Sequence, residues 1–360
     1  MKVHKKNIIY FLPADDYPSG GAKTIYNHSY IINKLGFKNF SSSIVHYKKK
    51  KSSKFILSIK KRIFDIKNLK NYGYLPDDFK IVKDFTPKKS WIDIKINHKN
   101  NLKFNPKTDF IIFPEIISHF AKKFSKTYKI KFAIFVQGVY HMNQTSNVKL
   151  FNEVYKKSSF IIDISDNTRK ALSNIIFNYK KKIIRTTLSV NPKAFKNAKK
   201  KINLITCMPR KLREDFNLLR FFTRNIIPKS WKILLLENMS NKEISKNLAK
   251  SKIFLSFSNF EGLGLPPLEA ALSGNKIIGY SGGAGDEYFK KPIFEKILKG
   301  DIYNFANKLK ENILTLKKNW HLQKDILYQR KKILKKYSLV NEKKGIIKIL
   351  TTVDSILKKN

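Results

Sequence analysis

Short apolar runs, each followed by a stretch with helical spacing, are the feature that most limits how this chain can fold. Residues 7–12 form a compact apolar run that ends before a proline, as expected of a buried strand. Residues 18–37 then begin with glycines, which predict a tight turn, and continue with apolar residues at helical spacing up to Gly36. Strand, glycine turn and helix in this order are typical of the first unit of a parallel α/β sheet.

The same alternation continues along the rest of the chain. A polar stretch with a proline at residues 189–201 interrupts it and predicts a linker. We therefore expect an α/β fold with two parallel-sheet domains, residues 1–188 and 189–335, and a C-terminal helix at 336–360 that packs back on the first domain. The further buried strands are predicted at residues 43–47, 110–114, 132–137, 160–165, 202–208, 231–236, 253–257 and 276–280.

Length and composition agree with two globular domains. The chain has 360 residues and is 42% hydrophobic, enough to bury two cores. Its single cysteine excludes an intramolecular disulfide and suits a reducing compartment. The first apolar run is too short for a signal sequence, and no stretch approaches the roughly 20 apolar residues of a spanning helix. The sequence therefore predicts a cytoplasmic protein.

The formal net charge of +48 raises the question of a polyanionic partner. Only eight of the 74 basic residues are arginine, although arginine is the residue that nucleic-acid surfaces favour. Lysine rises together with asparagine, isoleucine, phenylalanine and tyrosine, which share AT-rich codons, so a biased genome accounts for the charge. We expect no specific nucleic-acid partner, and a basic nucleic-acid-binding protein stays as an alternative function.

Residues 48–64 carry an apolar stripe with lysine on both flanks. The interpretation that we favour is an ordinary solvated helix in a lysine-rich protein. The alternative is a surface helix that contacts anionic lipid, which would place the protein peripherally at the inner face of a membrane.

The stretch EGLGLPPLE, residues 261–269, combines an acid, a glycine loop, two prolines and a second acid. A glycine loop that leads into a helix is a site for anions, because free N–H groups point outward and the helix dipole adds positive potential. Glu261 lies at the strand end, and we place Glu269 in the first turn of the helix, so both face one pocket. Two carboxylates beside an anion site suit a ligand with sugar hydroxyls at both ends of a diphosphate. The simpler interpretation of Glu269 is that it stabilises its own helix N-terminus.

This stretch, followed by SGNKIIGYSGGAGDEYF, resembles the donor-binding region of the GT-B-fold retaining glycosyltransferases of family four. The resemblance is most specific over residues 251–289, and it implies two Rossmann-like domains that face each other across a cleft. It also implies that Glu261 contacts the hydroxyls of the transferred sugar and that Glu269 binds the ribose. The residues whose amides would bind the phosphates are Gly262, Leu263, Gly264 and Leu265.

Cations are expected where the leaving diphosphate would lie. The stretch CMPRKLRED at 207–215 carries Arg210 and Lys211 between a predicted strand and a predicted helix, with Arg213 near them. Related transferases have an arginine and a lysine in this turn, which implies that these side chains hold the diphosphate. The alternative is plain surface charge. Cys207 is expected to be a buried strand-end residue and not a nucleophile.

The resemblance also implies functional residues in the first domain. Gly20 and Gly21 are similar to the glycine loop near the reaction centre of the family, with a plain turn as the alternative. His141 follows a strand where the family often places a histidine that contacts the transferred sugar, and Gln137 is its rival. Glu261 and His141 are therefore the two candidate catalytic residues.

Four other acids and one glycine pair complete the motif residues. By the resemblance, the pair Gly282–Gly283 lines the same cleft. No chemistry is assigned to the remaining acids, which are Asp286 and Glu287 after this pair and Asp163 and Asp166 in a predicted helix-capping turn.

Together these observations predict a hexosyltransferase. It would move a sugar from a nucleoside diphosphate sugar, held by the second domain, to a cell-surface glycan or lipid-linked acceptor, held by the first. Retention of configuration is implied by the resemblance. No metal and no cofactor is expected, because an Asp-x-Asp motif is absent and the seven histidines are scattered. Two further functions stay open, namely a nucleotide-sugar epimerase of similar shape and an inactive homologue that scaffolds an assembly.

Overall fold

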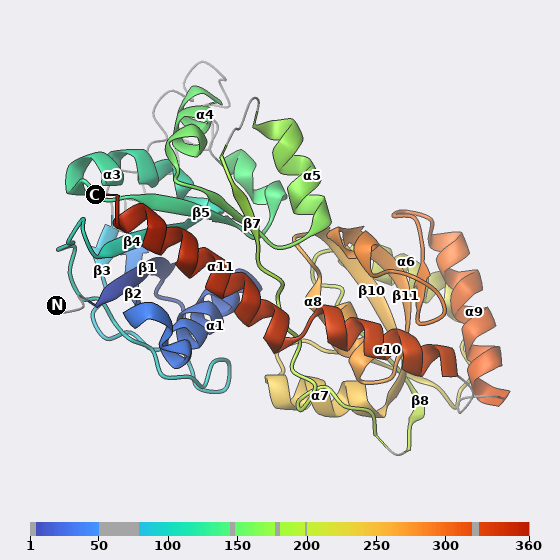
Figure 1. The fold of residues 1–360 in the computed structure, drawn as a ribbon. Helices are drawn as coiled ribbons and strands as arrows, with labels where there is room; N and C mark the ends of the chain where they lie inside the picture. Colours follow the sequence, from blue (N-terminus) through green and yellow to red (C-terminus); the bar gives the residue numbers. More distant parts are fainter. Residues whose placement is uncertain are drawn as a thin grey trace. The chain divides into compact units, whose positions relative to one another are not determined.

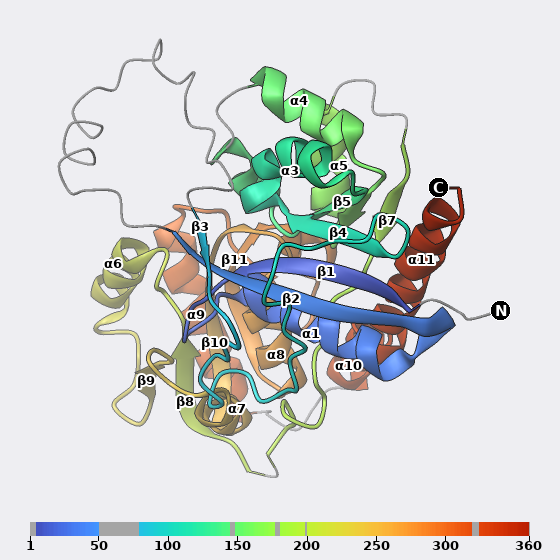
Figure 2. The same ribbon diagram turned by 90° about the vertical axis from the view of Figure 1, so that its left-hand side faces the viewer.

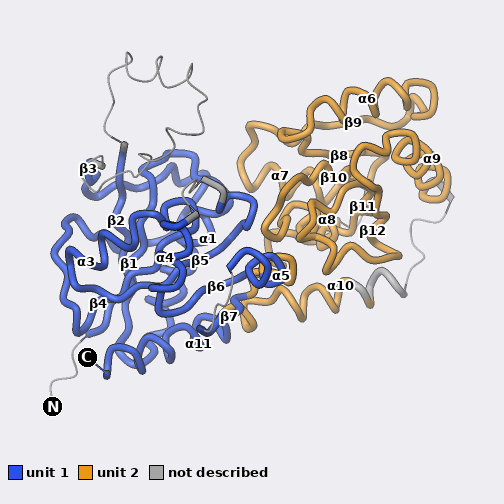
Figure 3. Tube along the Cα trace, turned by 90° about the horizontal axis from the view of Figure 1, so that it is seen from above, with its two compact units in different colours: residues 1–163, 169–186, 343–360 blue, residues 164–168, 187–342 orange. Residues whose placement is uncertain are grey.

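The chain folds into two compact units. The computed structural model describes residues 5–49, 79–144, 148–176, 181–198, 200–318 and 324–359. Unit 1 comprises residues 1–163, 169–186 and 343–360, and unit 2 comprises residues 164–168 and 187–342 (Figure 3). The sequence-based boundaries were 188/189 and 335/336, whereas the units divide at 186/187 and 342/343 and the first unit is interrupted at 164–168.

A seven-stranded sheet forms the centre of unit 1, in the order β3-β2-β1-β4-β5-β6-β7 (Figure 2). All neighbouring strands are parallel except β3, which runs antiparallel to β2. The five strands predicted in this part of the chain are all present, and β3 and β7 are additions that were too short to recognise. The bounds are β1 Lys6–Pro13, β2 Phe40–Lys49, β3 Phe79–Ile81, β4 Asp109–Pro114, β5 Phe132–Val136, β6 Ile161–Asp163 and β7 Ile183–Arg185.

Helices cover both faces of this sheet, which explains why its central strands are apolar on both sides. On one face, Ile9, Ile111 and Ile134 pack with residues of α3, α4 and α5. On the other face, the ring of His28 on α1 stacks on Phe135 with 4.9 Å between ring centroids. The helices are α1 Gly20–Leu35, α3 Ala121–Tyr128, α4 Val148–Lys157, α5 Asp166–Ile175 and α11 Leu339–Leu357 (Figure 1).

The start of α1 corrects one expectation. Gly20 and Gly21 do not form a tight turn but are the first two residues of the helix. The side chain of Ser19 caps this end by accepting a hydrogen bond from the N–H of Ala22. The helix ends where it was predicted to end, at Gly36, whose φ of 57° is the left-handed conformation common after a helix.

Unit 2 contains a five-stranded parallel sheet in the order β12-β11-β10-β8-β9. The side chains of α6 and α9 pack on one face around Phe257 and Phe305, and α10 lies against α8. The short strand β12 was not predicted. The strands are β8 Ile202–Cys207, β9 Lys232–Leu235, β10 Ser251–Glu261, β11 Lys276–Gly283 and β12 Phe294–Lys296. The helices are α6 Arg213–Thr223, α7 Asn241–Lys250, α8 Leu265–Leu272, α9 Ile302–Lys318 and α10 Lys324–Lys336.

Lys201 closes the segment that was predicted as a polar linker, yet it is 8% exposed. Its ammonium group donates to the carbonyl oxygens of Ser251 at 2.6 Å and Ser273 at 2.7 Å. Burial lowers the pKa of Lys201 to about 7. The residue therefore ties the start of β8 to the neighbouring elements of unit 2 instead of lying in solvent.

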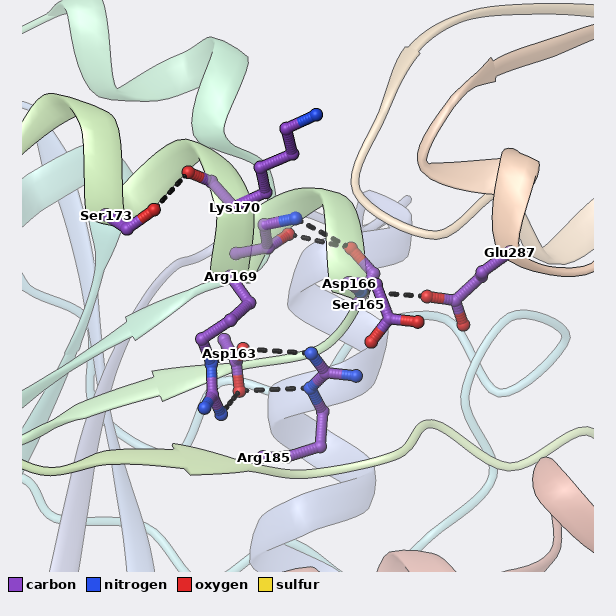
Figure 4. Close-up of polar contacts among 9 residues, drawn as sticks. Asp163, Ser165, Asp166, Arg169, Lys170, Ser173, Arg185 and Glu287 are labelled. Carbon is purple, nitrogen blue, oxygen red and sulfur yellow. Dashed lines mark hydrogen bonds and ion pairs between the residues drawn. The ribbon is translucent and has the colours of Figure 1, made fainter.

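Asp163 ends β6 at the first point where the chain passes from unit 1 to unit 2 (Figure 4). Its side chain is fully buried, with Arg169 Nε at 2.6 Å from one carboxylate oxygen and Arg185 Nε at 3.1 Å from the other. Asp163 is therefore an ion-pair partner inside the predicted helix-capping turn, and it is not itself the cap of α5. Ser165 provides that cap, because its hydroxyl oxygen accepts the N–H of Thr168 at 3.1 Å.

Candidate functional site

The glycine loop lies at the carboxyl edge of the second sheet, between β10 and α8. Glu261 is the last residue of β10, as expected, and Leu265 is the first of α8. Gly264 caps the helix with φ of 79°, a conformation that favours glycine. Because α8 begins at Leu265, Glu269 is its fifth residue, and the prediction that it lies in the first turn is wrong. Glu269 is half-buried.

The predicted cation Lys211 reaches this loop. It lies in the turn between β8 and α6, and its Nζ is 2.7 Å from Oε1 of Glu261. The same ammonium group donates to the carbonyl oxygen of Asn259 at 3.1 Å. The side chains of Lys211 and Glu261 are 36% and 28% exposed, so solvent reaches both partners. A cation and an acid that are far apart in the sequence therefore meet at one edge of the sheet.

The two arginines of the same turn differ in their surroundings. Arg210 is exposed. The guanidinium of Arg213 lies 2.5 Å from both carboxylate oxygens of Glu237, which follows β9. Lys211 therefore contacts the acid at the end of β10, directly before the glycine loop, whereas Arg213 pairs with Glu237.

The pair Gly282–Gly283 lies next to Glu261, where Gly283 pairs with this acid between β11 and β10. A Cβ atom on Gly282 would lie 3.0 Å from Cγ of Glu261, so only glycine leaves room for this acid. The acids that follow form ion pairs within unit 2. Asp286 lies 2.6 Å from Nζ of Lys296. Glu287 accepts hydrogen bonds from the hydroxyl of Tyr337 at 2.5 Å and from the N–H of Asp166 at 2.8 Å (Figure 4).

Sequence reasoning missed Tyr288, whose ring is 5% exposed. Its hydroxyl lies 3.0 Å from the carbonyl oxygen of Leu263 and 2.5 Å from that of Gly264. Burial raises the pKa of Tyr288 well above its ordinary value, and the charges of Glu261, Glu287, Asp286 and Glu269 raise it further. The aromatic residue after the glycine pair was the available signal, but periodicity explains it equally well as a core residue.

The candidates in unit 1 gather at the carboxyl edge of its own sheet. A Cβ atom on Gly21 would lie 3.4 Å from Oε1 of Gln137, so α1 begins against this amide. His141 is exposed, and its Nδ1 would be 2.9 Å from a Cβ atom on Gly138. The structure thus brings Gly21 and Gln137 together and places His141 over Gly138. Gly20 is exposed, and no atom lies within 4 Å of a Cβ built on it.

Glu115, directly after β4, is a second residue that the sequence did not reveal. It is 4% exposed and accepts a hydrogen bond from the N–H of Gln137 at 3.2 Å. Burial raises its pKa to about 7, although hydrogen bonds from backbone N–H groups act in the opposite direction. A buried acid thus supports the turn that carries Gln137 and Gly138.

The described residues offer little support for a cysteine nucleophile or a metal site. Cys207 is fully buried at the end of β8, and burial raises the pKa of its thiol to about 12, so it stays protonated at neutral pH. Within the ranges that the structure describes, no group of three or more His, Cys, Asp or Glu side chains could hold a metal ion. Over the same ranges, no helix is long and apolar enough to cross a membrane. Of the helix predicted at 48–64, residues 48 and 49 belong instead to strand β2, and residues 50–64 lie outside the described residues.

The comparison with curated sequences finds a related enzyme. The chain is 28% identical over 125 residues to an alpha-1,6-glucosyltransferase of Actinobacillus pleuropneumoniae serotype 7, a match that covers 33% of this chain and 38% of that protein. The match therefore spans well under half the length of either protein. No protein-family model matches the chain.

Solved structures match over nearly the whole chain. A sucrose-phosphate synthase of Thermosynechococcus elongatus has a TM-score of 0.64 at 9% identity and covers 99% of this chain and 100% of its own. TarM of S. aureus, solved with UDP, fondaparinux and α-GlcNAc-glycerol, has a TM-score of 0.63 at 14% identity, covering 96% and 99%. Anabaena HepE, solved with UDP-glucose, has a TM-score of 0.61 at 11% identity, covering 96% and 99%.

Proposed function

We propose that this chain, which has the GT-B fold expected from its sequence, is a glycosyltransferase that uses a nucleoside diphosphate sugar. The observation that carries the proposal is the meeting of Lys211, Glu261 and the glycine loop at the carboxyl edge of the second sheet. Ligands of open parallel sheets bind at this edge. The similarity to a glucosyltransferase and to structures that hold UDP or UDP-glucose supports the same assignment.

Unit 2 would bind the donor. The N–H groups of residues 262–265 and the side chains of Arg210 and Lys211 would hold the diphosphate. As the bond from the anomeric carbon to the phosphate lengthens, negative charge grows on the leaving group. Hydrogen-bond donors that are already in position stabilise that charge. Loss of one hydrogen-bond donor in such a site typically lowers the rate of transfer by about a hundredfold.

Each of the two acids of the loop would bind a different sugar of the nucleoside diphosphate sugar. Glu261 at the end of β10 would accept hydrogen bonds from hydroxyls of the transferred hexose. Glu269, one turn farther into α8, would accept those of the ribose. A carboxylate suits this role because each oxygen can accept from a hydroxyl, and such charge-assisted bonds are stronger than neutral ones.

Unit 1 would provide the acceptor side, with Gly20, Gly21 and His141 near the reacting sugar. The acceptor would be a cell-surface glycan or a lipid-linked sugar. Its hydroxyl would attack the anomeric carbon on the face from which the diphosphate departs and pass its proton to the leaving phosphate oxygen. This route retains the configuration and needs no second catalytic carboxylate from the protein. The choice of acceptor would rest with the irregular region at residues 48–105, of which residues 50–78 lie outside the described residues.

A binding screen tests the donor assignment. Thermal shift would be measured with uridine, guanosine and adenosine diphosphate sugars on the wild type, on Glu269→Ala and on Glu311→Ala. Glu311 is an exposed acid of α9 that pairs with Lys308. Its variant therefore loses the same charge as Glu269→Ala, but on another helix. We expect one nucleotide to stabilise the wild type and Glu311→Ala, and to stabilise Glu269→Ala much less.

The screen, together with an assay for nucleotide-sugar products and one for DNA binding, separates the rival functions. A wild type that no nucleotide stabilises, or a Glu269→Ala variant that responds fully, would contradict the donor assignment. Interconversion of two nucleotide sugars without an acceptor would identify an epimerase instead. Salt-dependent binding of unrelated DNA together with no nucleotide response would favour a nucleic-acid-binding protein.

A further inference from the structure

We propose that Tyr288 is the positioning residue of the donor site: its hydroxyl turns the N–H groups of Gly264 and Leu265 toward the diphosphate. The inference rests on the proposed function, since it assigns a residue to the site described there. Tyr288 itself touches no substrate in this proposal. It acts through the loop to which it is hydrogen-bonded.

The contact between this phenol and the loop is direct and double. The hydroxyl lies 3.0 Å from the carbonyl oxygen of Leu263 and 2.5 Å from that of Gly264. A phenol has a single proton to donate, so the two carbonyl groups share it. Both carbonyl groups of the loop are thereby held toward the interior of unit 2.

The direction of the carbonyl groups fixes the direction of the N–H groups. In a trans peptide, C=O and the following N–H point to opposite sides of the chain. When the carbonyl of Leu263 faces Tyr288, the N–H of Gly264 faces away from it. By the same argument, the carbonyl of Gly264 sets the N–H of Leu265.

These two donors matter because α8 has few others at its start. Neither N–H can find a carbonyl within the helix, since the first turn of a helix has no preceding partners. The next two residues are Pro266 and Pro267, which have no N–H. The anion-binding capacity of this helix end is therefore concentrated in the two peptides that Tyr288 orients.

The surroundings of Tyr288 are shaped to seat the hydroxyl at this point. A Cβ atom on Gly264 would lie 2.8 Å from the hydroxyl oxygen, and one on Gly285 would lie 3.2 Å from it. The ring is held in place by Phe294 and Tyr337, with centroids at 5.4 Å and 6.0 Å. The phenol therefore sits in a notch between two glycines, and neither its ring nor its oxygen has much freedom.

Comparison of Tyr288→Phe with Tyr280→Phe tests the proposal. Tyr280 is also buried in unit 2, and its hydroxyl donates to Asp215 at 2.9 Å. Both variants lose one buried hydroxyl and keep the ring, but only the first frees the loop. Binding of inorganic pyrophosphate and of uridine, guanosine and adenosine diphosphates would be measured by calorimetry.

We expect Tyr288→Phe to weaken pyrophosphate and the preferred nucleoside diphosphate by about tenfold, and Tyr280→Phe to change both by less than about twofold. The affinity for the corresponding nucleoside without phosphate should be the same in both variants. This selective loss is a change that a purely structural role of Tyr288 would not produce, since lower stability alone does not discriminate between ligands.

The possible outcomes separate this inference from the proposed function. If the wild type binds a nucleoside diphosphate and Tyr288→Phe binds it equally well, the positioning role is wrong and the function stands. If both Tyr variants lose affinity to the same extent, the role is again wrong. If the wild type binds neither pyrophosphate nor any of the nucleoside diphosphates, the proposed function itself fails.

Discussion

Nζ of Lys211 and Oε1 of Glu261 lie 2.7 Å apart, although Lys211 belongs to the turn after β8 and Glu261 ends β10. This cation and this acid neutralise each other. Both side chains are about one-third exposed, so the pair adds little to stability. In the proposed donor site, a bound diphosphate would attract Lys211 and leave Glu261 free for a sugar hydroxyl.

Glu261→Gln should separate donor binding from transfer. The amide cannot accept the charge-assisted hydrogen bonds of the carboxylate, so the transfer rate should fall by roughly a hundredfold. The affinity for the nucleoside diphosphate should be unchanged or higher, because Lys211 loses its competing partner. Calorimetry with the diphosphate and an assay of its release from the donor sugar measure the two effects.

The matched control for that variant is Glu237→Gln. This change removes the acid that pairs with Arg213, the first residue of α6 and a near neighbour of Lys211 in the sequence. We expect its transfer rate to stay within a few-fold of the wild type. Equal losses in both variants would mean that general charge near the turn matters, and not the specific role of Glu261.

His141→Ala should reduce transfer and leave the binding of the nucleoside diphosphate intact, because the proposed contact of His141 is with the transferred sugar, whereas the diphosphate would bind to the loop at 262–265 of unit 2. The expected loss in rate is about ten- to a hundredfold, as for a side chain that contacts the reacting sugar. Gln137→Ala is the comparison that the sequence leaves open. If this variant loses the rate and His141→Ala does not, the assignment of His141 is wrong.

Asp163→Asn should destabilise unit 1 by about 3 kcal/mol, because it removes a buried charge that two arginines share. Asp286→Asn is the control, since this acid also forms an ion pair but is 52% exposed. Asp286→Asn should lower the free energy of unfolding by less than about 1 kcal/mol. Urea unfolding of the full chain provides both free energies, and similar values for the two variants would contradict the prediction.

The buried acid Glu115 should make stability depend on pH. Its pKa is about 7 in the folded chain against an ordinary value of 4.5, so the folded state binds the proton more tightly. This contribution to stability is present at low pH and is lost as the pH rises from about 4.5 to about 7.

Removal of the carboxyl tests that dependence. The difference in unfolding free energy between wild type and Glu115→Gln should change by about 3 kcal/mol over the same interval, with the wild type losing relative stability as pH rises. Glu153→Gln is the control, because the half-buried Glu153 has its pKa lowered by a hydrogen bond from Lys122. A pH profile of Glu115→Gln parallel to that of the wild type would contradict the shift.

Gly264→Ala should lower the free energy of unfolding by more than the positive φ of this residue alone explains. Its φ is 79°, and a Cβ atom would approach the hydroxyl of Tyr288 to 2.8 Å. Gly300→Ala is the control, because its φ of 87° is similar and nothing lies within 4 Å of the added atom. Each should lose about 1–2 kcal/mol from the backbone, and Gly264→Ala about 1–2 kcal/mol more from the contact.

The excess cost should disappear in the background of Tyr288→Phe, since that variant removes the atom in contact. Thermal unfolding of the two single variants and the double variant gives the coupling between positions 264 and 288. An excess that persists without the hydroxyl would place the conflict elsewhere.

The sequence was sufficient for features that repeat or that act locally. Apolar runs predicted the central strands of both sheets, because parallel strands covered on both faces must be apolar throughout. The start of the loop at Glu261 was predicted from its glycines and prolines, and the end of α1 from Gly36. The resemblance in the same region predicted the GT-B fold.

Residues that act through distant contacts could not be predicted in this way. Lys201 looked like part of a solvated linker because its three carbonyl partners come from other segments. Tyr288 and Glu115 gave no local signal, since their roles depend on what the fold places beside them. The short strand β3, Phe79–Ile81, exists because β2 offers an edge to pair with, which no window of three residues reveals.

Unit 1 is completed from both ends of the chain. Lys6 of β1 pairs with Asp354 of α11, a residue that lies 348 positions later. A ribosome making this protein releases that partner only after it has made all of residues 187–342, the main part of unit 2. All residues of unit 2 are therefore made before residues 343–357 of α11, the part of this helix that belongs to unit 1.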